Sequence, residues 1–457
     1  MNIINIAFSG AQAARQGMST TSMNVANYLT PGYSRQGIIQ SAIGTNGDSF
    51  SAGNGVRVDS IRRISDQYLV NQVWHSNTRA EYYDAGQKYL GALESVIGTD
   101  STSLGGGLDK FFAALNALTT QPDSPALRQQ LLNEGQSLAT RFNNVDSFIS
   151  SQKVSINTQR DALVGNVNVL SKNIASYNQQ IADQEATGGN ASVLRDQRDE
   201  LVKELSSMVS VKVSEDASGR YNVSLNDGQP LVNGRNFGQL KSTMNQQGEQ
   251  EVSLEFLNTT FGVSSAIGGQ LGALNDYEQG TLKTMQSAVR DMAEQFAKEF
   301  NAQLADGYDL SMSGQKGKPL FVFDLTSGKG MLQISDLKPD ELALSDKADE
   351  SGNGNNLTAL IELKNKKIAI GNMGNMSVNE AAAAIISTVG IASRQNKTEL
   401  EAATSVSYQA QTQRDNLSAV NQDEEAMNLQ VYMQAYQSNL KVIATGNQIF
   451  SDLLMLF

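Results

Sequence analysis

Hydrophobic residues at the start of the chain recur at alternating steps of three and four. Thr21 is the one polar position in a register that otherwise contains Ile4, Ala7, Ala11, Ala14, Met18 and Val25. This spacing is typical of an amphipathic helix that buries one stripe in a coiled coil. The register ends before Thr30-Pro31-Gly32-Tyr33, where proline and glycine suit the two central positions of a type II turn.

The C-terminal segment has a longer register of the same kind. Asn447 is its one polar member among Ala426, Leu429, Met433, Tyr436, Leu440, Ile443, Asn447, Phe450, Leu454 and Phe457. The acidic run Asp423-Glu424-Glu425 occupies the expected first turn, where the helix dipole favours anions. A helix that ends as Leu453-Leu454-Met455-Leu456-Phe457 needs a partner, because a contiguous apolar surface is unfavourable in water.

Between these ends the period of the pattern changes several times. Residues about 36–65 contain short β-like runs, and a helical period dominates from Asp66 to Met208 with a glycine turn at 187–190. Because that turn is short, the helices on its two sides are expected to form an antiparallel pair. From Val209 to about residue 265 the period is two, with an Asn226-Asp227-Gly228 hairpin turn.

A further helix is expected over residues 282–300, followed by an irregular stretch over about 306–360. Ser377-Val378-Asn379-Glu380 is a capping-box sequence that opens an alanine-rich helix, and the period weakens between Asn416 and Asn421. The predicted fold is therefore mainly α. It comprises a terminal α-helical coiled coil and a long-helix bundle domain with a small β-hairpin excursion.

The same patterns suggest a division of the chain. Residues 1–65 would form the N-terminal helix and connecting segment of an inner coiled-coil domain, and 416–457 its C-terminal helix. Residues 66–415 would form a helical outer domain, with a β-rich insertion over about 209–265 and the irregular stretch over about 306–360.

Composition narrows the possible functions. The 457 residues have a formal net charge of −12, so nucleic-acid and membrane-surface binding are disfavoured. Cysteine is absent and histidine occurs once, which removes thiol nucleophiles, disulfides, zinc–thiolate sites and most imidazole chemistry. No run of 18 apolar residues exists to span a bilayer, and the N-terminus is not a secretory signal peptide.

Individual candidate sites are weak. His75 has no nucleophile beside it, and we expect a surface or partly packed helix residue. Gly105-Gly106-Gly107 lacks the Gly-Lys-Ser/Thr of a phosphate loop and is expected to be a flexible helix connection. A calcium loop counted from Asp349 would need glutamate where Leu360 stands, so a solvated loop is favoured. The sequence predicts no catalytic, cofactor or metal site, and no enzyme activity.

Two terminal segments resemble one family. Residues 22–36, which include Pro31-Gly32-Tyr33-Ser34-Arg35-Gln36, are similar to the N-terminal motif of flagellar rod, hook and hook-associated proteins, and within that group to the hook-associated members. Residues 420–443 are similar to the C-terminal block of the same family. Gln422, Ser438 and Leu440 depart from its usual residues, and the stretch 306–360 is short for it.

The resemblance implies an extracellular structural protein that joins the flagellar hook to the filament as a ring of identical subunits. Its implied partners are other copies of the chain, the hook protein, a second hook-associated protein on the filament side, and a cytoplasmic chaperone that holds the C-terminal helix before type III export. A rod or hook subunit is the alternative within the family. A secreted enzyme with flagellar-type ends and a cytoplasmic coiled-coil scaffold are less favoured.

The expected assembly interface combines the two apolar registers with the turn between them. Asn447 could fix the helix register there, and Arg35 is available for a polar contact. The candidate residues are Ile4, Ala11, Met18, Val25, Pro31, Gly32, Tyr33, Arg35, Leu429, Met433, Tyr436, Leu440, Ile443, Asn447, Phe450, Leu454 and Phe457.

Overall fold

The computed structural model describes residues 2–44, 53–99, 102–246, 248–310 and 314–455. The chain forms two compact units. The first contains residues 1–81, 163–269 and 402–457, and the second contains residues 82–162 and 270–401. The chain passes from one unit to the other four times: within the long helices α2 (Gln67–Gly98), α4 (Pro125–Ala186) and α9 (Val378–Ser418), and at the first residue of α6 (Gly269–Asp276).

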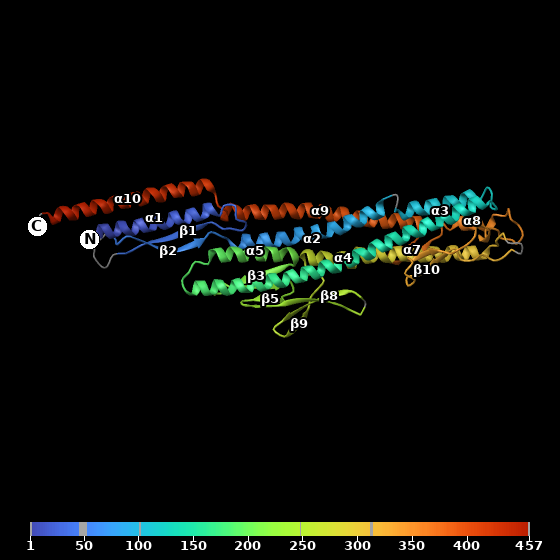
Figure 1. The fold of residues 1–457 in the computed structure, drawn as a ribbon, viewed down its shortest axis with the longest axis horizontal. Coiled ribbons are helices and arrows are strands. Elements are labelled where there is room, and N and C mark those ends of the chain that lie inside the picture. The colour runs from blue at the N-terminus through green and yellow to red at the C-terminus, as the bar shows by residue number, and fades with distance from the viewer. Residues whose placement is uncertain (1, 45–52, 100–101, 247, 311–313, 456–457) are drawn as a thin grey trace. The chain divides into compact units, whose positions relative to one another are not determined.

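The first unit contains both chain ends. Helix α1 (Asn2–Ala26) lies beside helix α10 (Gln422–Leu454) (Figure 1). The β-like runs after α1 form an antiparallel hairpin of β1 (Gln36–Ala42) and β2 (Val56–Arg63), which packs on α1. The helical conformation is interrupted between α9 and α10, as the weakened period near residues 416–421 predicted. The Asn421 side chain caps α10 by accepting hydrogen bonds from Asp423 N and Glu424 N.

The β-rich part of this unit consists of two small antiparallel sheets. Strands β3 (Val211–Glu215), β4 (Tyr221–Leu225), β5 (Pro230–Asn233) and β6 (Asn236–Phe237) form the first sheet. Strands β7 (Gln239–Met244), β8 (Gln250–Phe256) and β9 (Thr259–Gly262) form the second. The predicted hairpin turn joins β4 to β5, and Gly228 has the positive φ of 90° that the turn requires.

Helix α5 (Ser192–Met208) folds back on α4 and holds the first sheet. The buried guanidinium of Arg198 donates to Asn178 Oδ1 at 2.9 Å and to Gly219 O at 2.7 Å. The same group lies 3.4 Å from the ring centroid of Tyr221, and Trp74 packs edge-on against that ring. The antiparallel helix pair that the glycine turn predicted is therefore present, and a cation–π contact joins it to the sheet.

The second unit is helical around a cluster of aromatic rings. It includes α3 (Leu104–Leu118), α6 (Gly269–Asp276), a π-helix (Tyr277–Leu282), α7 (Lys283–Asp306) and α8 (Asn355–Glu362). Its core contains a phenylalanine cluster of Phe111, Phe112, Phe296, Phe300 and Phe321. Arg160 of α4 is buried and pairs with the buried Glu278 at 2.5 Å. The capping box is also present, since Ser377 N donates to Glu380 and Glu380 N donates to Ser377 Oγ.

The stretch over about 306–360 is mostly without regular structure, but it includes the short strands β10 (Phe321–Phe323) and β11 (Leu332–Ile334) and the start of α8, and its apolar residues are buried. One local prediction was wrong. Residues 105–107 are helical and belong to α3, not to a flexible connection. Ser103 caps this helix through Gly106 N, and a Cβ at Gly107 would lie 2.6 Å from Arg141 Cδ, so glycine allows close packing here.

The predicted fold class is confirmed: the molecule is mainly α with small antiparallel β excursions, which include a hairpin of β12 (Ile368–Ile370) and β13 (Gly374–Met376). The expected division into inner and outer domains at residues 65 and 415 stays a prediction.

The turn between β8 and β9 supplies a test of backbone strain. Leu257 has a φ of +46° and a side chain that is 68% exposed. A leucine in the left-handed region is strained, so Leu257→Gly should raise the free energy of unfolding by about 1 kcal/mol in a urea titration. Met244→Gly is the matched control, because Met244 is similarly exposed but lies in strand β7. The control should lose stability, and an equal loss in Leu257→Gly would show that the turn is not strained.

Candidate assembly interface

Helices α1 and α10 pair in antiparallel orientation with a seven-residue repeat. Four levels along the pair bring Ile4 beside Gly446, Gly10 beside Asn439, Gly17 beside Tyr432 and Asn24 beside Glu425. Successive partners are separated by six or seven residues on α1 and by seven on α10, which is the spacing of a coiled-coil seam. The two ends of the chain therefore form a coiled coil, with the N-terminus of one helix near the C-terminus of the other (Figure 1).

Glycine sets the separation of the two helices. A Cβ at Gly10 would lie 2.7 Å from Asn439 Oδ1, and a Cβ at Gly17 would lie 2.6 Å from the ring of Tyr432. A Cβ at Gly446 would lie 2.8 Å from Ile4 Cγ1. Three of the four levels thus combine a glycine with a larger partner side chain, so the helices approach more closely there than two apolar registers would allow.

Asn24 closes the seam and satisfies all of its hydrogen-bonding groups. It is 1% exposed, and its Nδ2 donates to Gln36 O and to Glu425 Oε1, both at 2.9 Å. Its Oδ1 accepts from the Gln36 N–H and from the Tyr33 hydroxyl, also at 2.9 Å. An amide has two donors and two acceptor lone pairs, so this side chain joins α1, the following turn, β1 and α10 with none left over.

The turn after α1 has the predicted geometry. Gly32 has a φ of +76°, and Tyr33 N donates to Thr30 O at 3.2 Å. These features fit a type II turn with Pro31 and Gly32 in the central positions. The turn is fixed to α9, because Arg414 donates to Gly32 O at 2.7 Å and to Ser34 Oγ at 3.2 Å.

A buried ion-pair network fixes the same turn to α5. Ser34 N donates to Asp196 Oδ2 at 3.0 Å, and Arg63 from β2 donates to Asp196 at 3.0 Å and to Asp199 at 2.6 Å. The two carboxylates raise the pKa of Arg63 despite its burial. Burial, together with the charge of Asp196, raises the pKa of Tyr33 to about 12, so its hydroxyl keeps the proton that it donates to Asn24.

Arg35 spans the break between α9 and α10. Its backbone N–H donates to Ser418 O at 2.8 Å, and its guanidinium pairs with Glu424 Oε2 at 2.6 Å. The sequence predicted that this arginine would make a polar contact, and the structure supplies the partner. Glu424 therefore pairs with Arg35, and Glu425 accepts a hydrogen bond from Asn24. The N-terminus of α10 is capped by Asn421.

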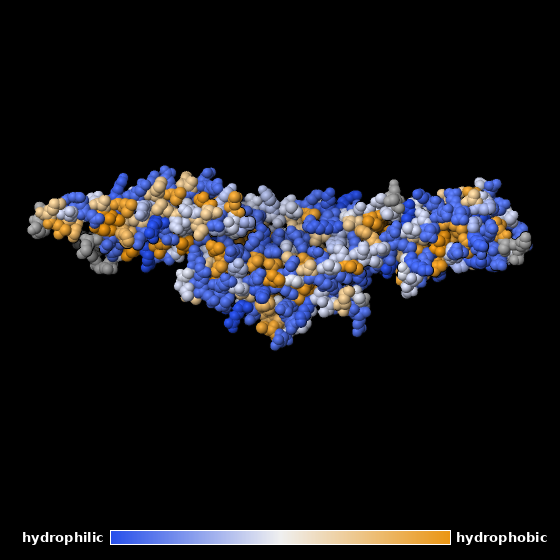
Figure 2. Space-filling model, in the orientation of Figure 1, coloured by the Kyte–Doolittle hydropathy of each residue, from blue (hydrophilic) through white to orange (hydrophobic). Residues whose placement is uncertain are grey.

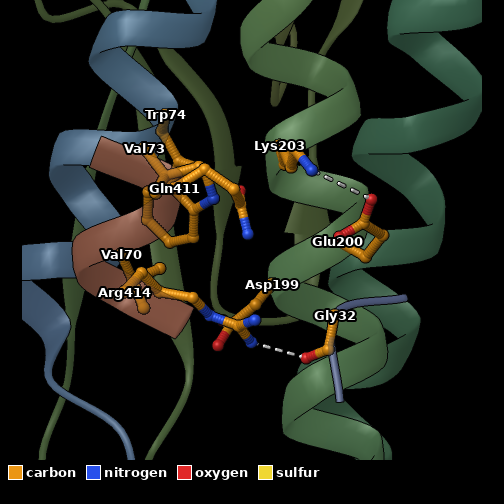
Figure 3. A pocket seen from close by; sticks show the side chains of 9 residues that line it. All are labelled: Gly32, Val70, Val73, Trp74, Asp199, Glu200, Lys203, Gln411 and Arg414. Atoms are coloured by element: carbon orange, nitrogen blue, oxygen red, sulfur yellow. Dashed lines mark hydrogen bonds and ion pairs between the residues drawn. The ribbon is translucent and has the colours of Figure 1, made fainter. Parts of the chain in front are cut away.

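The cavity below the turn is too small for a cofactor. Its lining includes Gly32, Trp74, Glu200, Lys203 and Arg414, and Figure 3 shows the Gly32 carbonyl accepting from Arg414. The cavity holds about 40 Å³, which suits a few water molecules and not a ligand of ordinary size. Among the described residues there is also no group of three or more histidine, cysteine or acidic side chains placed to hold a metal ion.

The predicted interface residues differ in exposure. In the N-terminal part, Ala11 and Tyr33 are buried, Ile4, Met18, Gly32 and Arg35 are half-buried, and Val25 and Pro31 are exposed. On α10, Tyr436 and Ile443 are half-buried, whereas exposure is high at Leu429, Met433, Leu440, Asn447, Phe450 and Leu454. Phe457 lies outside the described residues.

The apolar register of α10 is therefore not the register that faces α1. The stripe that faces α1 runs through Glu425, Tyr432, Asn439 and Gly446, which are polar, aromatic or small. Sequence reasoning missed this stripe because the apolar residues beside it give the stronger periodic signal. Figure 2 shows apolar residues on the surface of α1 and α10 in the free chain.

Other residues of the interface also escaped the sequence reasoning. Asn24, Asp196 and Glu425 bind the turn and the two terminal helices together, and of these Asn24 and Glu425 lie inside the two terminal segments that carry the family resemblance. Arg63 and Arg414 lie outside these segments. Pairing partners separated by more than one hundred residues leave no periodic signal, so the helical pattern alone could not have found them.

A mainly helical structural protein with paired chain ends is the class that this geometry defines. Comparison with known proteins makes that class specific. A family profile described as "Flagellar hook-associated protein FlgK helical domain" matches residues 90–321. This chain belongs to that family, whose members are the hook-associated proteins of the flagellar hook–filament junction, and it is a structural component of the extracellular flagellum.

The similarity covers the whole chain. It is 28% identical to flagellar hook-associated protein 1 of Salmonella typhimurium, with 99% of each chain covered, and 27% identical to that of Escherichia coli strain K12, with the same coverage. The Bacillus subtilis protein of the same name is 28% identical, with 98% of this chain and 96% of that protein covered.

One solved structure has a similar fold. The flagellar hook junction protein FlgK from Burkholderia pseudomallei superposes with a TM-score of 0.67 at 17% identity, over 76% of this chain and 99% of that one. The family, the flagellar function and the location predicted from the two terminal motifs are confirmed. Among the described residues there is no helix that is both long and apolar enough to cross a membrane.

The hydrogen bonds of Asn24 lead to a first test of the interface. Asn24→Ala should leave Tyr33, Gln36 and Glu425 with buried groups that lack partners, at a cost of about 1–3 kcal/mol for each group. We expect faster amide exchange in α10 and in the last turns of α1. Asn5→Ala, at an exposed position of α1, should leave exchange unchanged. Equal protection in both variants would contradict the assigned role.

The glycine seam leads to a second test. Gly17→Leu should force the ring of Tyr432 away and weaken the α1–α10 pair by about 1–3 kcal/mol. Adding Tyr432→Ala to the same chain should recover much of this loss, because the new side chain then has room. Limited proteolysis of the chain ends measures both effects. Ser19→Leu, at an exposed position of α1, should have no effect, and a double variant as sensitive as Gly17→Leu would rule out direct contact.

Proposed function

We propose that this chain is a structural adaptor that joins the hook to the filament as a ring of identical subunits. The observation that carries the proposal is the apolar stripe of α10, which contains Leu440, Phe450 and Leu454 and stays exposed in the isolated chain at 44%, 58% and 62%. Contiguous apolar surface of this kind marks an interaction site. Burying each side chain in an assembly would contribute about 1.5–3 kcal/mol.

The partners follow from the names of the relatives and from this surface. One axial face of the ring would contact the hook and the other would contact a further hook-associated protein. The proposed interface is the set of residues predicted from the sequence, carried by α1, the turn at Pro31–Arg35 and α10. In this proposal the terminal segments 1–65 and 416–457 form an inner coiled-coil domain, and residues 66–415 form the outer part.

Before assembly the same apolar stripe would need protection. We propose that a cytoplasmic chaperone covers α10 until the chain is exported unfolded through the flagellar type III apparatus. The absence of cysteine from the sequence suits such export, since no disulfide has to be made or broken. The work of the protein in this proposal is mechanical, and no residue is assigned to a reaction.

The adaptor proposal is tested by a charge in the stripe. Leu454→Asp should leave both compact units folded but abolish filament attachment, because burial of an unpaired carboxylate costs more than the lost apolar contact contributes. Electron microscopy of flagella should show hooks without filaments, and flagellin should appear in the medium. A pull-down with the export chaperone should also recover less of this variant.

Gln437→Asp is the matched control, since Gln437 lies on the polar side of α10 and is exposed. It should swim and bind the chaperone normally. A Leu454→Asp strain that swims as well as this control would overturn the adaptor interface.

A further inference from the structure

Helix α9 ends and α10 begins at a point where the local sequence does not require a break. Only Ala419, Val420 and Asn421 separate the two helices (Figure 1). The sequence has no glycine or proline from Ile391 to Thr445, so no residue of that stretch excludes a helical backbone. Helix α9 is already formed over 41 residues, and extending a formed helix avoids the cost of a new nucleus. Local preference therefore favours one continuous helix.

The carbonyl of Ser418 shows what holds the two helices apart. In a continuous α-helix this oxygen would accept from the N–H of Gln422, four residues further on. It accepts instead from Arg35 N at 2.8 Å, and Ser418 is 0% exposed. A buried carbonyl needs a donor, and here the N–H of Arg35 takes the place of the N–H of Gln422.

The same N-terminal segment also holds the start of α10. We call residues 24–35 the docking segment. The Arg35 guanidinium pairs with Glu424 Oε2 at 2.6 Å, and Asn24 Nδ2 donates to Glu425 Oε1 at 2.9 Å. These partners are 389 and 401 residues apart in the sequence, so the break depends on tertiary contacts.

The N-terminal cap of α10 has little influence on the choice between a broken and a continuous helix. The Asn421 side chain accepts from Asp423 N and Glu424 N. In a continuous helix the same two N–H groups would bond to Ala419 O and Val420 O, so the cap exchanges one pair of hydrogen bonds for another. The contacts that favour the break over the continuous helix therefore come from the docking segment.

We propose that residues 419–421 are a conformational switch controlled by the N-terminal part of the same chain. While the docking segment is bound, α9 and α10 are separate helices, and α10 starts at the level fixed by Asn24. When the segment is released, Gln422 N donates to Ser418 O and the two helices join into one. Docking and the direction of α10 are coupled, since the segment binds only the broken arrangement. All of these contacts lie within one chain, so the inference does not depend on the adaptor proposal.

Arg35→Pro tests the switch in the full-length chain, because proline has no N–H to donate to Ser418 O. The α-carbon chemical shifts of Val420 and Asn421 report the backbone, which is extended at Asn421 in the docked form. In the variant both shifts should take helical values, and exchange of the Gln422 amide should slow by about tenfold or more. Arg35→Ala is the matched control. It keeps the N–H and loses only an ion pair whose glutamate is half-exposed, so it should retain the wild-type shifts.

Gln422→Pro supplies the opposite test, since it is compatible with the break but not with a continuous helix. Gln422 is the first residue of α10, where proline is favoured, and Asn421 already has the extended backbone that a following proline requires. Inside a continuous helix the ring would clash with the preceding turn, and the bond to Ser418 O could not form. Added to Arg35→Pro, Gln422→Pro should return the Asn421 shift to its wild-type value, whereas Gln422→Ala should leave it helical.

Asn24→Ala releases the docking segment without a change at Arg35, and it should move the Val420 and Asn421 shifts in the helical direction. Amide protection of strands β3 to β5 shows in each variant that the sheet is folded. If Arg35→Pro loses this protection, Asn24→Ala, alone and with Gln422→Pro, decides by the same shifts. The inference is overturned if the shifts of folded variants stay at wild-type values, or if Gln422→Pro does not reverse their change.

Discussion

The first unit depends on the four hydrogen bonds of Asn24. This one buried amide connects α1, the turn, β1 and α10, and each of its bonds would otherwise leave a buried polar group without a partner. The contact with Glu425 spans 401 residues of sequence. Because the geometry of an amide admits few alternatives, it fixes the level at which α10 starts along α1. The glycine seam can then continue in register toward the two chain ends.

The glycine seam explains why apolar side chains stay on the surface. Where Gly10 and Gly17 meet Asn439 and Tyr432, the helices are close together and leave little room for leucine or methionine between them. The longest apolar side chains of α10 therefore flank the contact instead of filling it. In a coiled coil with leucine at the contact positions, these apolar side chains would be buried between the two helices of the same chain. Helices α1 and α10 are instead held together by close packing at glycine and by polar hydrogen bonds. The apolar side chains of α10 therefore stay exposed.

Periodicity predicted much of this fold because helices and hairpins are local. The α1 register, the Asn226-Asp227-Gly228 turn and the Ser377–Glu380 capping box were read from neighbouring residues and are present. The side of α10 that faces α1 could not be predicted in this way. A helix with apolar residues on both flanks gives its strongest signal beside the true seam. The α1-facing stripe is defined by glycine, asparagine and tyrosine, which carry no hydrophobic period. The partners of Arg63 and Arg414 depend on tertiary packing, so the local sequence pattern could not predict them either.

In the proposed assembly, the polar contacts around the turn and the apolar flanks of α10 have separate roles, the first in folding and the second in association. Buried bonds to Asp196, Arg63 and Arg414 hold the turn within one chain, and their geometry is satisfied without a neighbour. The apolar flanks of α10 contribute favourable free energy only when another surface excludes water from them. Directional bonds specify where the terminal helices point, and in the proposed assembly non-directional burial would supply the free energy of association. A junction between two different polymers needs both properties, since its subunits must present a fixed surface before a partner is bound.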